Sequence, residues 1–165
     1  MKDSPILDRI RKEYGASIVD VYRHNERRVY VTVDEHTAPR LCCWMHEVLG
    51  GRLAIATGID TRSGIEILYH FLYSDEHLLV TVKTKVRKPL PTIESIGQYM
   101  PAAQWIEREL HDILGMDFEK HPDMRRLIMS DDWPKDVYPL RRDFPLTYEV
   151  PQFSWNKDQP PEVIK

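Results

Sequence analysis

The chain has 165 residues, of which 42% are hydrophobic and 30% are charged, and its formal net charge is −3. This length and composition are typical of one globular domain, alone or with an extension. The small net charge argues against a nucleic-acid-binding protein, because such proteins usually carry a strong basic excess. No apolar run approaches the ~20 residues that cross a bilayer, and the first residues contain no apolar signal core. The sequence therefore predicts a protein that is cytosolic, or lies on the cytoplasmic side of a membrane and is held there by partners.

The N-terminal part of the chain predicts a helix followed by two strands. Ser4 is placed to cap the helix, and Gly15 ends it. Its apolar positions at helical spacing are Ile6, Leu7 and Ile10. Residues 18–22 and 28–33 have the pattern of strands, and the polar residues 24–27 between them fit a hairpin turn.

A second helix and three further strands come next. Thr37 is the candidate N-cap of the helix, and Gly50-Gly51 marks its end. One apolar helical face is formed by Leu41, Met45, Val48 and Leu49. The strand patterns that follow, separated by turn-forming residues, cover residues 53–59, 65–73 and 77–86.

The last of these strands carries basic side chains at alternating positions, namely Lys83, Lys85 and Arg87. A solvated strand face is the preferred interpretation of this row. A site for phosphate or a lipid headgroup is the alternative.

A third helix is predicted from Pro101 to Gly115, after a proline-containing break at residues 88–91. The element order is then αββαβββα. Two blocks of strands with helices between them favour an α+β fold with a mostly antiparallel sheet. We assign residues 1–115 to this domain.

Residues 116–165 have a different composition. They contain 7 of the 12 prolines and none of the 7 glycines, which favours a stiff, extended chain. Aromatic residues, which are scarce in disordered tails, recur along the segment at Trp133, Tyr138, Phe144, Tyr148, Phe153 and Trp155. We interpret the segment as an extended arm that buries aromatic anchors on another surface. A partner chain is the preferred surface, and the arm's own domain is the alternative.

The two cysteines, Cys42 and Cys43, are adjacent. They are poorly placed to bridge each other and do not form a C-x-x-C ligand pair. An iron–sulfur cluster normally takes four thiolates, so this chain alone is predicted to hold no cluster. We interpret both residues as core and flank positions of the second helix rather than as reactive thiols.

Candidate functional residues gather in the third helix. Trp105, Glu109 and Asp112 share one face, and two carboxylates on one face suit a metal site or an acid–base pair. The helix supplies no third ligand on that face, because His111 pairs with Glu107 on another. We therefore predict that Glu109 and Asp112 meet the arginines that follow. Those arginines are Arg125, Arg126, Arg141 and Arg142.

The triplet His121-Pro122-Asp123 allows several interpretations. It is also the hallmark of J-domain co-chaperones, where it joins two long helices, but Pro134 and Pro139 leave no second long helix here. A turn histidine bonded to backbone is the preferred interpretation of His121, and a proton relay is the alternative. An enzyme that uses Glu109, Asp112 and His121 is a further hypothesis. The chain has no glycine-rich phosphate loop and no G-x-S-x-G nucleophile motif.

Two separated blocks of sequence resemble one known family. The residues that carry the resemblance are Glu107, Arg108, Glu109, Asp112, Gly115, Phe118, His121, Pro122, Asp123, Met124, Arg125 and Arg126, followed by Pro139, Leu140, Arg141, Arg142, Asp143, Phe144 and Pro145. In this order they resemble the thirty-kilodalton subunit of NADH:quinone oxidoreductase (complex I), a family shared with the energy-converting NiFe hydrogenases. The αββαβββα domain is similar to the family's fold, and the resemblance covers all but about the last fifteen residues.

The resemblance implies a structural role. It implies an accessory subunit of the hydrophilic arm that binds no cofactor and whose C-terminal stretch wraps along the large catalytic subunit. That neighbour binds quinone in complex I and nickel–iron in the hydrogenases. Partner subunits would hold the NiFe and iron–sulfur centres, or flavin and iron–sulfur. The site residues above would then be interface and structural positions rather than catalytic ones.

Two departures from the complex I pattern favour the hydrogenase branch. Complex I members usually have glycine before the His-Pro pair, where this chain has Lys120. The linker at residues 132–138 and the short arm are also more similar to the hydrogenases. We therefore expect a non-catalytic subunit of an energy-converting hydrogenase, with complex I as the alternative. Its expected partners are the large catalytic and iron–sulfur subunits, and through them a membrane module, with no nucleic acid.

Overall fold

Two groups of strands, each antiparallel within itself, join to form one sheet. The computed structural model describes residues 4–145, and statements on structure refer to this part of the chain. The first group is β1 (Ile18–Asn25) and β2 (Arg28–Val33). The second is β3 (Arg52–Asp60), β4 (Ile65–Tyr73) and β5 (Leu78–Val86). The strand order is β1-β2-β5-β4-β3, and the groups meet where β2 pairs with β5 in parallel.

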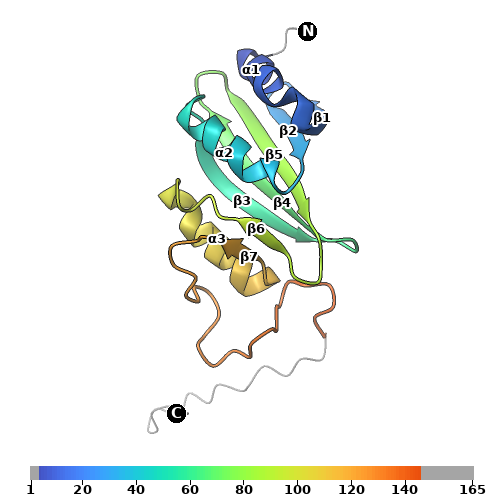
Figure 1. The fold of residues 1–165 in the computed structure, drawn as a ribbon, viewed down its shortest axis with the longest axis vertical. Coiled ribbons are helices and arrows are strands. Elements are labelled where there is room, and N and C mark those ends of the chain that lie inside the picture. Colours follow the sequence, from blue (N-terminus) through green and yellow to red (C-terminus); the bar gives the residue numbers. More distant parts are fainter. Residues whose placement is uncertain (1–3, 146–165) are drawn as a thin grey trace.

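The helices lie on one face of this sheet. Figure 1 shows α1 (Pro5–Tyr14) and α2 (Thr37–Glu47) across it, with α3 (Pro101–Leu114) lower, beside β3. A 3-10 turn (Gly15–Ser17) links α1 to β1. In β2, β4 and β5 alternate residues face the helices and are buried, as a half-covered sheet requires. In β4 these residues are Ile65, Ile67, Tyr69, Phe71 and Tyr73.

The predicted α+β order αββαβββα is confirmed, and so is the mostly antiparallel sheet. Two strands were missed because each has only three residues. They are β6 (Thr92–Glu94) and β7 (Asp117–Glu119), which pair in parallel around α3. Met116 and Phe118, just beyond the predicted end of the domain, are buried in the core.

The helix ends test the predicted caps. Ser4 caps α1 as predicted, because its hydroxyl oxygen accepts a hydrogen bond from the Ile6 N–H at 3.2 Å. The prediction for Thr37 is wrong. Thr37 is the first residue of α2, and Asp34 Oδ1 accepts its N–H at 2.8 Å while Oδ2 accepts its hydroxyl at 2.8 Å. A carboxylate three residues earlier therefore satisfies the free donor at this helix start.

The predicted packing role of the cysteines agrees with their positions in α2. Cys42 is buried in the core and Cys43 is half-buried. Burial raises the pKa of both thiols, that of Cys43 to about 11, so both are protonated at neutral pH.

Candidate interaction site around helix α3

Helix α3 approaches the edge strand β3 closely because β3 has a glycine at the contact. A Cβ atom on Gly58 would lie 2.4 Å from Leu114 Cδ1 and 2.9 Å from Leu110 Cδ2. The side chains that α3 buries are Ala103, Glu107, Leu110, Asp112 and Leu114. Two of these are carboxylates, and each of them binds backbone outside the helix.

Arg108 and Asp112, one helical turn apart, hold the segment at residues 125–129 against α3. The Arg108 guanidinium donates to the carbonyls of Arg125 and Arg126 at 2.7 and 2.8 Å. Asp112 Oδ2 accepts the N–H groups of residues 127, 128 and 129 at 2.7, 2.8 and 3.2 Å. Burial alone would raise the pKa of Asp112, but these three bonds outweigh it and lower the pKa, so the carboxylate is ionised at neutral pH.

The predicted pairing of Asp112 with an arginine side chain is therefore wrong. The irregular segment after α3 has backbone donors and acceptors that no sheet or helix satisfies. The charged side chains of α3 form hydrogen bonds with these backbone groups instead of with the arginine side chains. Glu109, the other carboxylate of the predicted pair, is exposed on α3. The structure does not bring Glu109, Asp112 and His121 together as a catalytic group would require.

Arg126 and Trp133 shape the next part of the segment in the same manner. Arg126 Nη1 donates to the carbonyls of Ser130 and Trp133, both at 2.7 Å. The indole N–H of Trp133 donates to the Val137 carbonyl at 2.7 Å. The loop is thus built mainly from side chain to backbone bonds, without regular secondary structure.

Arg141 closes the C-terminal end of α3. Its Nε donates to the Leu114 carbonyl at 2.7 Å and its Nη2 to the Gly115 carbonyl at 3.3 Å, while its guanidinium lies 4.7 Å from the Tyr138 ring centroid. A cation here satisfies free carbonyls and suits the negative end of the helix dipole. Gly115, predicted to end the helix, has φ 67°, and a Cβ atom there would lie 2.5 Å from the Tyr138 ring.

The second sequence block also contacts the sheet. Asp60, at the end of β3, accepts the Arg142 N–H at 2.8 Å and pairs with Lys88. Pro139 is half-buried, whereas Arg142 and Asp143 present their side chains to solvent. Up to residue 145 the predicted arm thus lies on its own domain. Residues 146–165, with the predicted anchors Tyr148, Phe153 and Trp155, lie outside the described residues, so the wrapping of a partner stays a prediction.

Glu107 is the most deeply buried charged group of the site. Its Oε2 accepts from the Ser95 hydroxyl at 2.5 Å and from the Gly97 N–H at 3.3 Å, and its Oε1 accepts from the Ile96 N–H at 2.8 Å. These bonds hold the loop between β6 and α3. Burial raises the pKa of Glu107 to about 7, although the three hydrogen bonds oppose the shift.

The preferred interpretation of His121, a turn histidine bonded to backbone, is confirmed. Its side chain is fully buried, with Nε2 at 3.1 Å from the Gln104 carbonyl and 3.7 Å from Glu107 Oε2. Its Nδ1 accepts the Asp123 N–H at 3.0 Å. This pattern assigns the proton to Nε2 in the neutral imidazole. Because both ring nitrogens contact backbone groups, this geometry does not favour the alternative of a proton relay.

The remaining residues of the triplet region form an exposed turn. The Asp123 carboxylate accepts from the Arg125 guanidinium, with Oδ2 2.7 Å from Nη2, and this contact holds the pKa of Asp123 well below its usual value. Pro122 is exposed. Lys120 has φ 62°, a conformation that favours glycine, and its Nζ pairs with Glu94 at 2.7 Å. The backbone at Lys120 thus adopts a conformation that a glycine would adopt more easily.

Large apolar side chains remain exposed on the outer side of α3 and the segment that follows it. Trp105 is 65% exposed, Ile128 51% and Leu140 60%. The Arg108 guanidinium lies 5.8 Å from the Trp105 ring, so the indole rests beside a held cation. Exposed tryptophan and arginine are the residue types that dominate protein interfaces.

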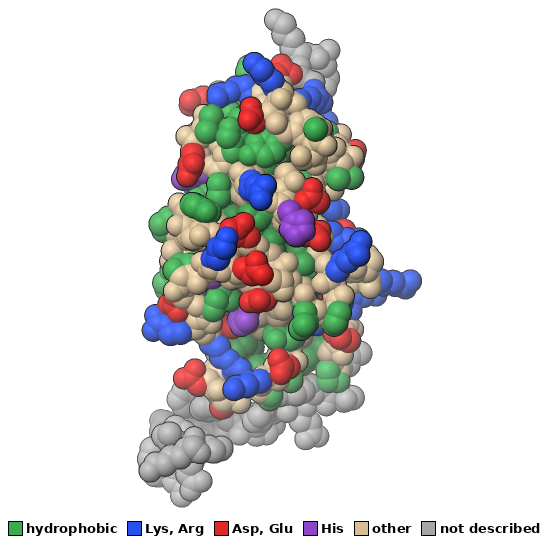
Figure 2. All heavy atoms as spheres, viewed as in Figure 1, with side chains coloured by type: hydrophobic (Ala, Val, Ile, Leu, Met, Phe, Trp, Pro, Cys, Tyr) green, Lys and Arg blue, Asp and Glu red, His purple; other side chains and the backbone are tan. Residues whose placement is uncertain are grey.

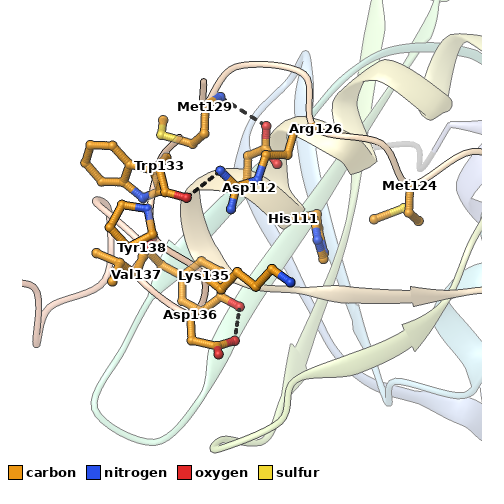
Figure 3. A pocket seen from close by; sticks show the side chains of 11 residues that line it. His111, Asp112, Met124, Arg126, Met129, Trp133, Lys135, Asp136, Val137 and Tyr138 are labelled. Atoms are coloured by element: carbon orange, nitrogen blue, oxygen red, sulfur yellow. Dashed lines mark hydrogen bonds between the residues drawn. The ribbon is translucent and has the colours of Figure 1, made fainter. Parts of the chain in front are cut away.

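A cavity of about 350 Å³ opens between α3 and the loop at residues 129–138. Figure 3 shows Arg126 and Asp112 at its inner side, with Trp133, Lys135 and Asp136 around the loop. Its polar side chains are largely engaged in holding the loop, as the dashed bonds show.

The helix face of the molecule carries both signs of charge. Figure 2 shows acidic and basic side chains interspersed over it, with apolar ones between them. Within residues 4–145 no group of three or more His, Cys, Asp or Glu is placed to hold a metal ion. None of the helices in that range has the length and apolar content needed to cross a bilayer.

These features define a small α+β domain in which charged side chains hold an irregular segment against helix α3. The model of the family "Respiratory-chain NADH dehydrogenase, 30 Kd subunit" matches residues 31–150, which is more than half of the chain. The chain belongs to this family, as the two sequence blocks predicted.

Relatives come from both branches of the family. An "NADH-quinone oxidoreductase" subunit of Geobacter metallireducens is 30% identical over 143 residues, covering 84% of this chain and 86% of the relative. "Hydrogenase-4 component G" of Escherichia coli is 31% identical over 142 residues, which are 84% of this chain but only 26% of the relative. "Formate hydrogenlyase subunit 5" of the same organism is 30% identical over 25% of its length.

Solved structures support the fold. A chain of the "membrane-bound sulfane sulfur reductase (MBS), an archaeal respiratory membrane complex" superposes with a TM-score of 0.74 at 24% identity, covering 86% of this chain and 85% of that one. The "Nqo5" trypsin-resistant fragment superposes with a TM-score of 0.59 at 20% identity, covering 72% and 98%. The predicted family and fold are thus confirmed, while the choice between the branches stays a prediction.

Proposed function

We propose that this chain is a structural subunit of the hydrophilic arm of a membrane-bound redox complex, and that it docks on the large catalytic subunit through the outer side of α3. The observation that carries the proposal is the exposed set Trp105, Ile128 and Leu140 on a segment fixed by charged side chains. An apolar surface that is already ordered before binding loses little conformational entropy when it binds. The arm beyond residue 145 would extend the contact.

The relatives support a large partner. In two Escherichia coli hydrogenase proteins the region similar to this chain is about a quarter of a longer polypeptide. There the domain is joined covalently to a much larger portion. We infer that a similar portion is the separate partner of this chain.

We favour the energy-converting NiFe hydrogenase branch, on the basis of Lys120 and of the linker at residues 132–138. Nickel, iron and iron–sulfur clusters would then reside in partner subunits, and this chain would hold none. Its place would be peripheral, on the cytoplasmic side of the membrane. Complex I is the second candidate, and it is supported by an "NADH-quinone oxidoreductase" subunit from Chloroherpeton thalassium that is 42% identical over 142 residues.

Two other hypotheses lose support. A J-domain needs a second long helix after the triplet, and within the described chain α3 is followed by an irregular segment. A self-standing enzyme needs free catalytic groups that lie together, but Asp112 and His121 are engaged in backbone bonds and Glu109 points to solvent.

The test is purification of the tagged chain from its native cell, with identification of co-purifying subunits and metal analysis. A large subunit with nickel and iron would support the hydrogenase branch, and flavin with iron–sulfur but no nickel would support complex I. Ile128→Glu should abolish recovery of the large subunit. Val48→Glu is the matched control, because Val48 is 49% exposed at the end of α2 and belongs neither to α3 nor to the segment that follows it. Recovery of the chain alone would refute the proposal.

A further inference from the structure

The five-stranded sheet has a second face that no described element covers. All three helices pack on the core face, and alternate residues of β4 and β5 point away from it. Along β4 the core-facing residues are buried, whereas those between them are only half-buried. We call the side turned away from the helices the open face.

Strand register identifies the side chains that share this face. One row crosses all five strands and consists of Tyr22, Tyr30, Thr81, His70 and Ile55. The Tyr22 and Tyr30 rings lie 6.1 Å apart, and His70 Nδ1 lies 2.9 Å from Thr81 Oγ1. Tyr22 is 56% exposed and Ile55 53%, so the row ends in exposed apolar surface on both edges of the sheet.

The neighbouring rows add further apolar side chains. By the same register, the open face also contains Leu68, Leu72, Leu79 and Ile59. Of these, Ile59 is 45% exposed and the leucines are half-buried. A solvent-facing side of an antiparallel sheet is usually polar. Tyrosine, leucine and isoleucine spread over five strands instead indicate a surface that another molecule covers.

The charge of the open face is opposite to that of the chain. Its cations are Arg28, Arg52, Lys83 and Lys85, and its anions are Asp20 and Glu66, which gives a formal charge of +2 from four cations less two anions. The whole chain has a net charge of −3. Glu66 is already held by Lys83 at 2.9 Å and Lys85 at 3.5 Å. Lys83, Lys85 and Glu66 together keep a charge of +1, and Arg28 and Arg52 with Asp20 contribute the other +1, which suits an acidic counterpart.

We propose that the open face docks a second protein partner whose contact surface combines apolar and acidic side chains. This partner is distinct from the one proposed for α3, because the two surfaces lie on opposite sides of the sheet. The chain would then lie between two neighbouring subunits and contact both of them. This inference rests on the proposed function only in that the partner belongs to the same assembly.

The first test is lysine footprinting with an acetylating reagent on the isolated chain and on the native complex. Lys83 and Lys85 have side-chain exposures of 35% and 43%, so both react in the isolated chain. In the complex we expect their labelling to slow by roughly tenfold or more, because interface cores exclude solvent and reagent. Lys12, exposed on α1, is the control and should label equally in both. Equal labelling of Lys83 and Lys85 in both samples would overturn the proposal.

The second test addresses the chemistry of the partner. Carbodiimide, which joins lysine amines to carboxylates without a spacer, should link Lys83 or Lys85 to an Asp or Glu of another subunit in the complex. The internal link from Lys83 to Glu66 reports that the reagent has reacted. Only internal links would contradict an acidic partner. Flotation of the isolated chain with phosphatidylglycerol vesicles, together with unprotected lysines in the complex, would assign the face to lipid and overturn the proposal.

A pair of variants separates this inference from the function proposed above. Ile55→Glu places a carboxylate in an exposed position, so the chain should fold, retain the large subunit and lose the second partner. Ile128→Glu should lose the large subunit instead. If Ile128→Glu loses nothing, the α3 proposal fails while the lysine protection still decides the open face. If Ile55→Glu retains every subunit of the native complex, the open-face proposal fails.

Discussion

Replacing Glu107 by glutamine tests whether burial or hydrogen bonding has the larger effect on the pKa of this carboxylate. Burial raises the pKa of Glu107 from 4.5 to about 7 in the folded protein. The folded protein thus holds the proton more tightly than the unfolded chain, and the free energy of unfolding falls as the pH rises from 4.5 to 7. A difference of roughly 2.5 pH units at about 1.4 kcal/mol each amounts to about 3 kcal/mol. Glutamine cannot titrate, so this loss should be absent in the variant.

The assay is urea unfolding of the wild type and Glu107→Gln between pH 4.5 and about pH 8. The stability of the variant minus that of the wild type should increase by about 3 kcal/mol across this range. Glu109→Gln is the control, since Glu109 is exposed on the same helix and its difference should stay nearly constant. A flat or opposite trend for Glu107→Gln would show that the bonds from Ser95, Ile96 and Gly97 outweigh burial, and would refute the reasoning.

Three further substitutions test how the segment after α3 is held. Asp112→Ala removes the acceptor of three backbone N–H groups. We expect the free energy of unfolding to fall by about 2–3 kcal/mol and amide exchange at residues 127–129 to become faster. Unchanged exchange would show that Asp112 does not hold this segment. Gly115→Ala should destabilise the protein by about 2 kcal/mol in thermal unfolding, since φ is 67° and the new methyl would contact the Tyr138 ring; an unchanged melting temperature would argue against it. Arg141→Lys should cost about 1–2 kcal/mol, because a lysine cannot keep both carbonyl contacts and the ring contact; full stability would mean that charge alone suffices.

Much of the fold was predictable because it follows from local patterns. Ser4 at a helix start, Gly115 at a helix end and the alternation in β4 each act through neighbouring residues. Even Lys120 marks a special position, since its positive φ is one that glycine adopts more easily.

The candidate site was predictable in its members but not in their contacts. Asp112, Arg108, Arg126 and Arg141 were all identified, yet the expected partner of Asp112 was an arginine side chain. In the structure these groups bind backbone carbonyls and N–H groups. Ser95 and Asp60 were not identified at all, because each is an ordinary residue whose partner lies far along the chain.

The sequence by itself determined the helices, the main strands, their caps with one exception, and the family to which the chain belongs. Only the tertiary structure decided the parallel pairing of β2 with β5, the short pair β6 and β7, and the hydrogen bonds that hold residues 125–145 against α3. The physical reason is that every non-proline residue has the same backbone donor and acceptor. When a side chain binds backbone, or when two distant strands pair, the partner residue can therefore be of any type. The sequence alone does not identify that partner.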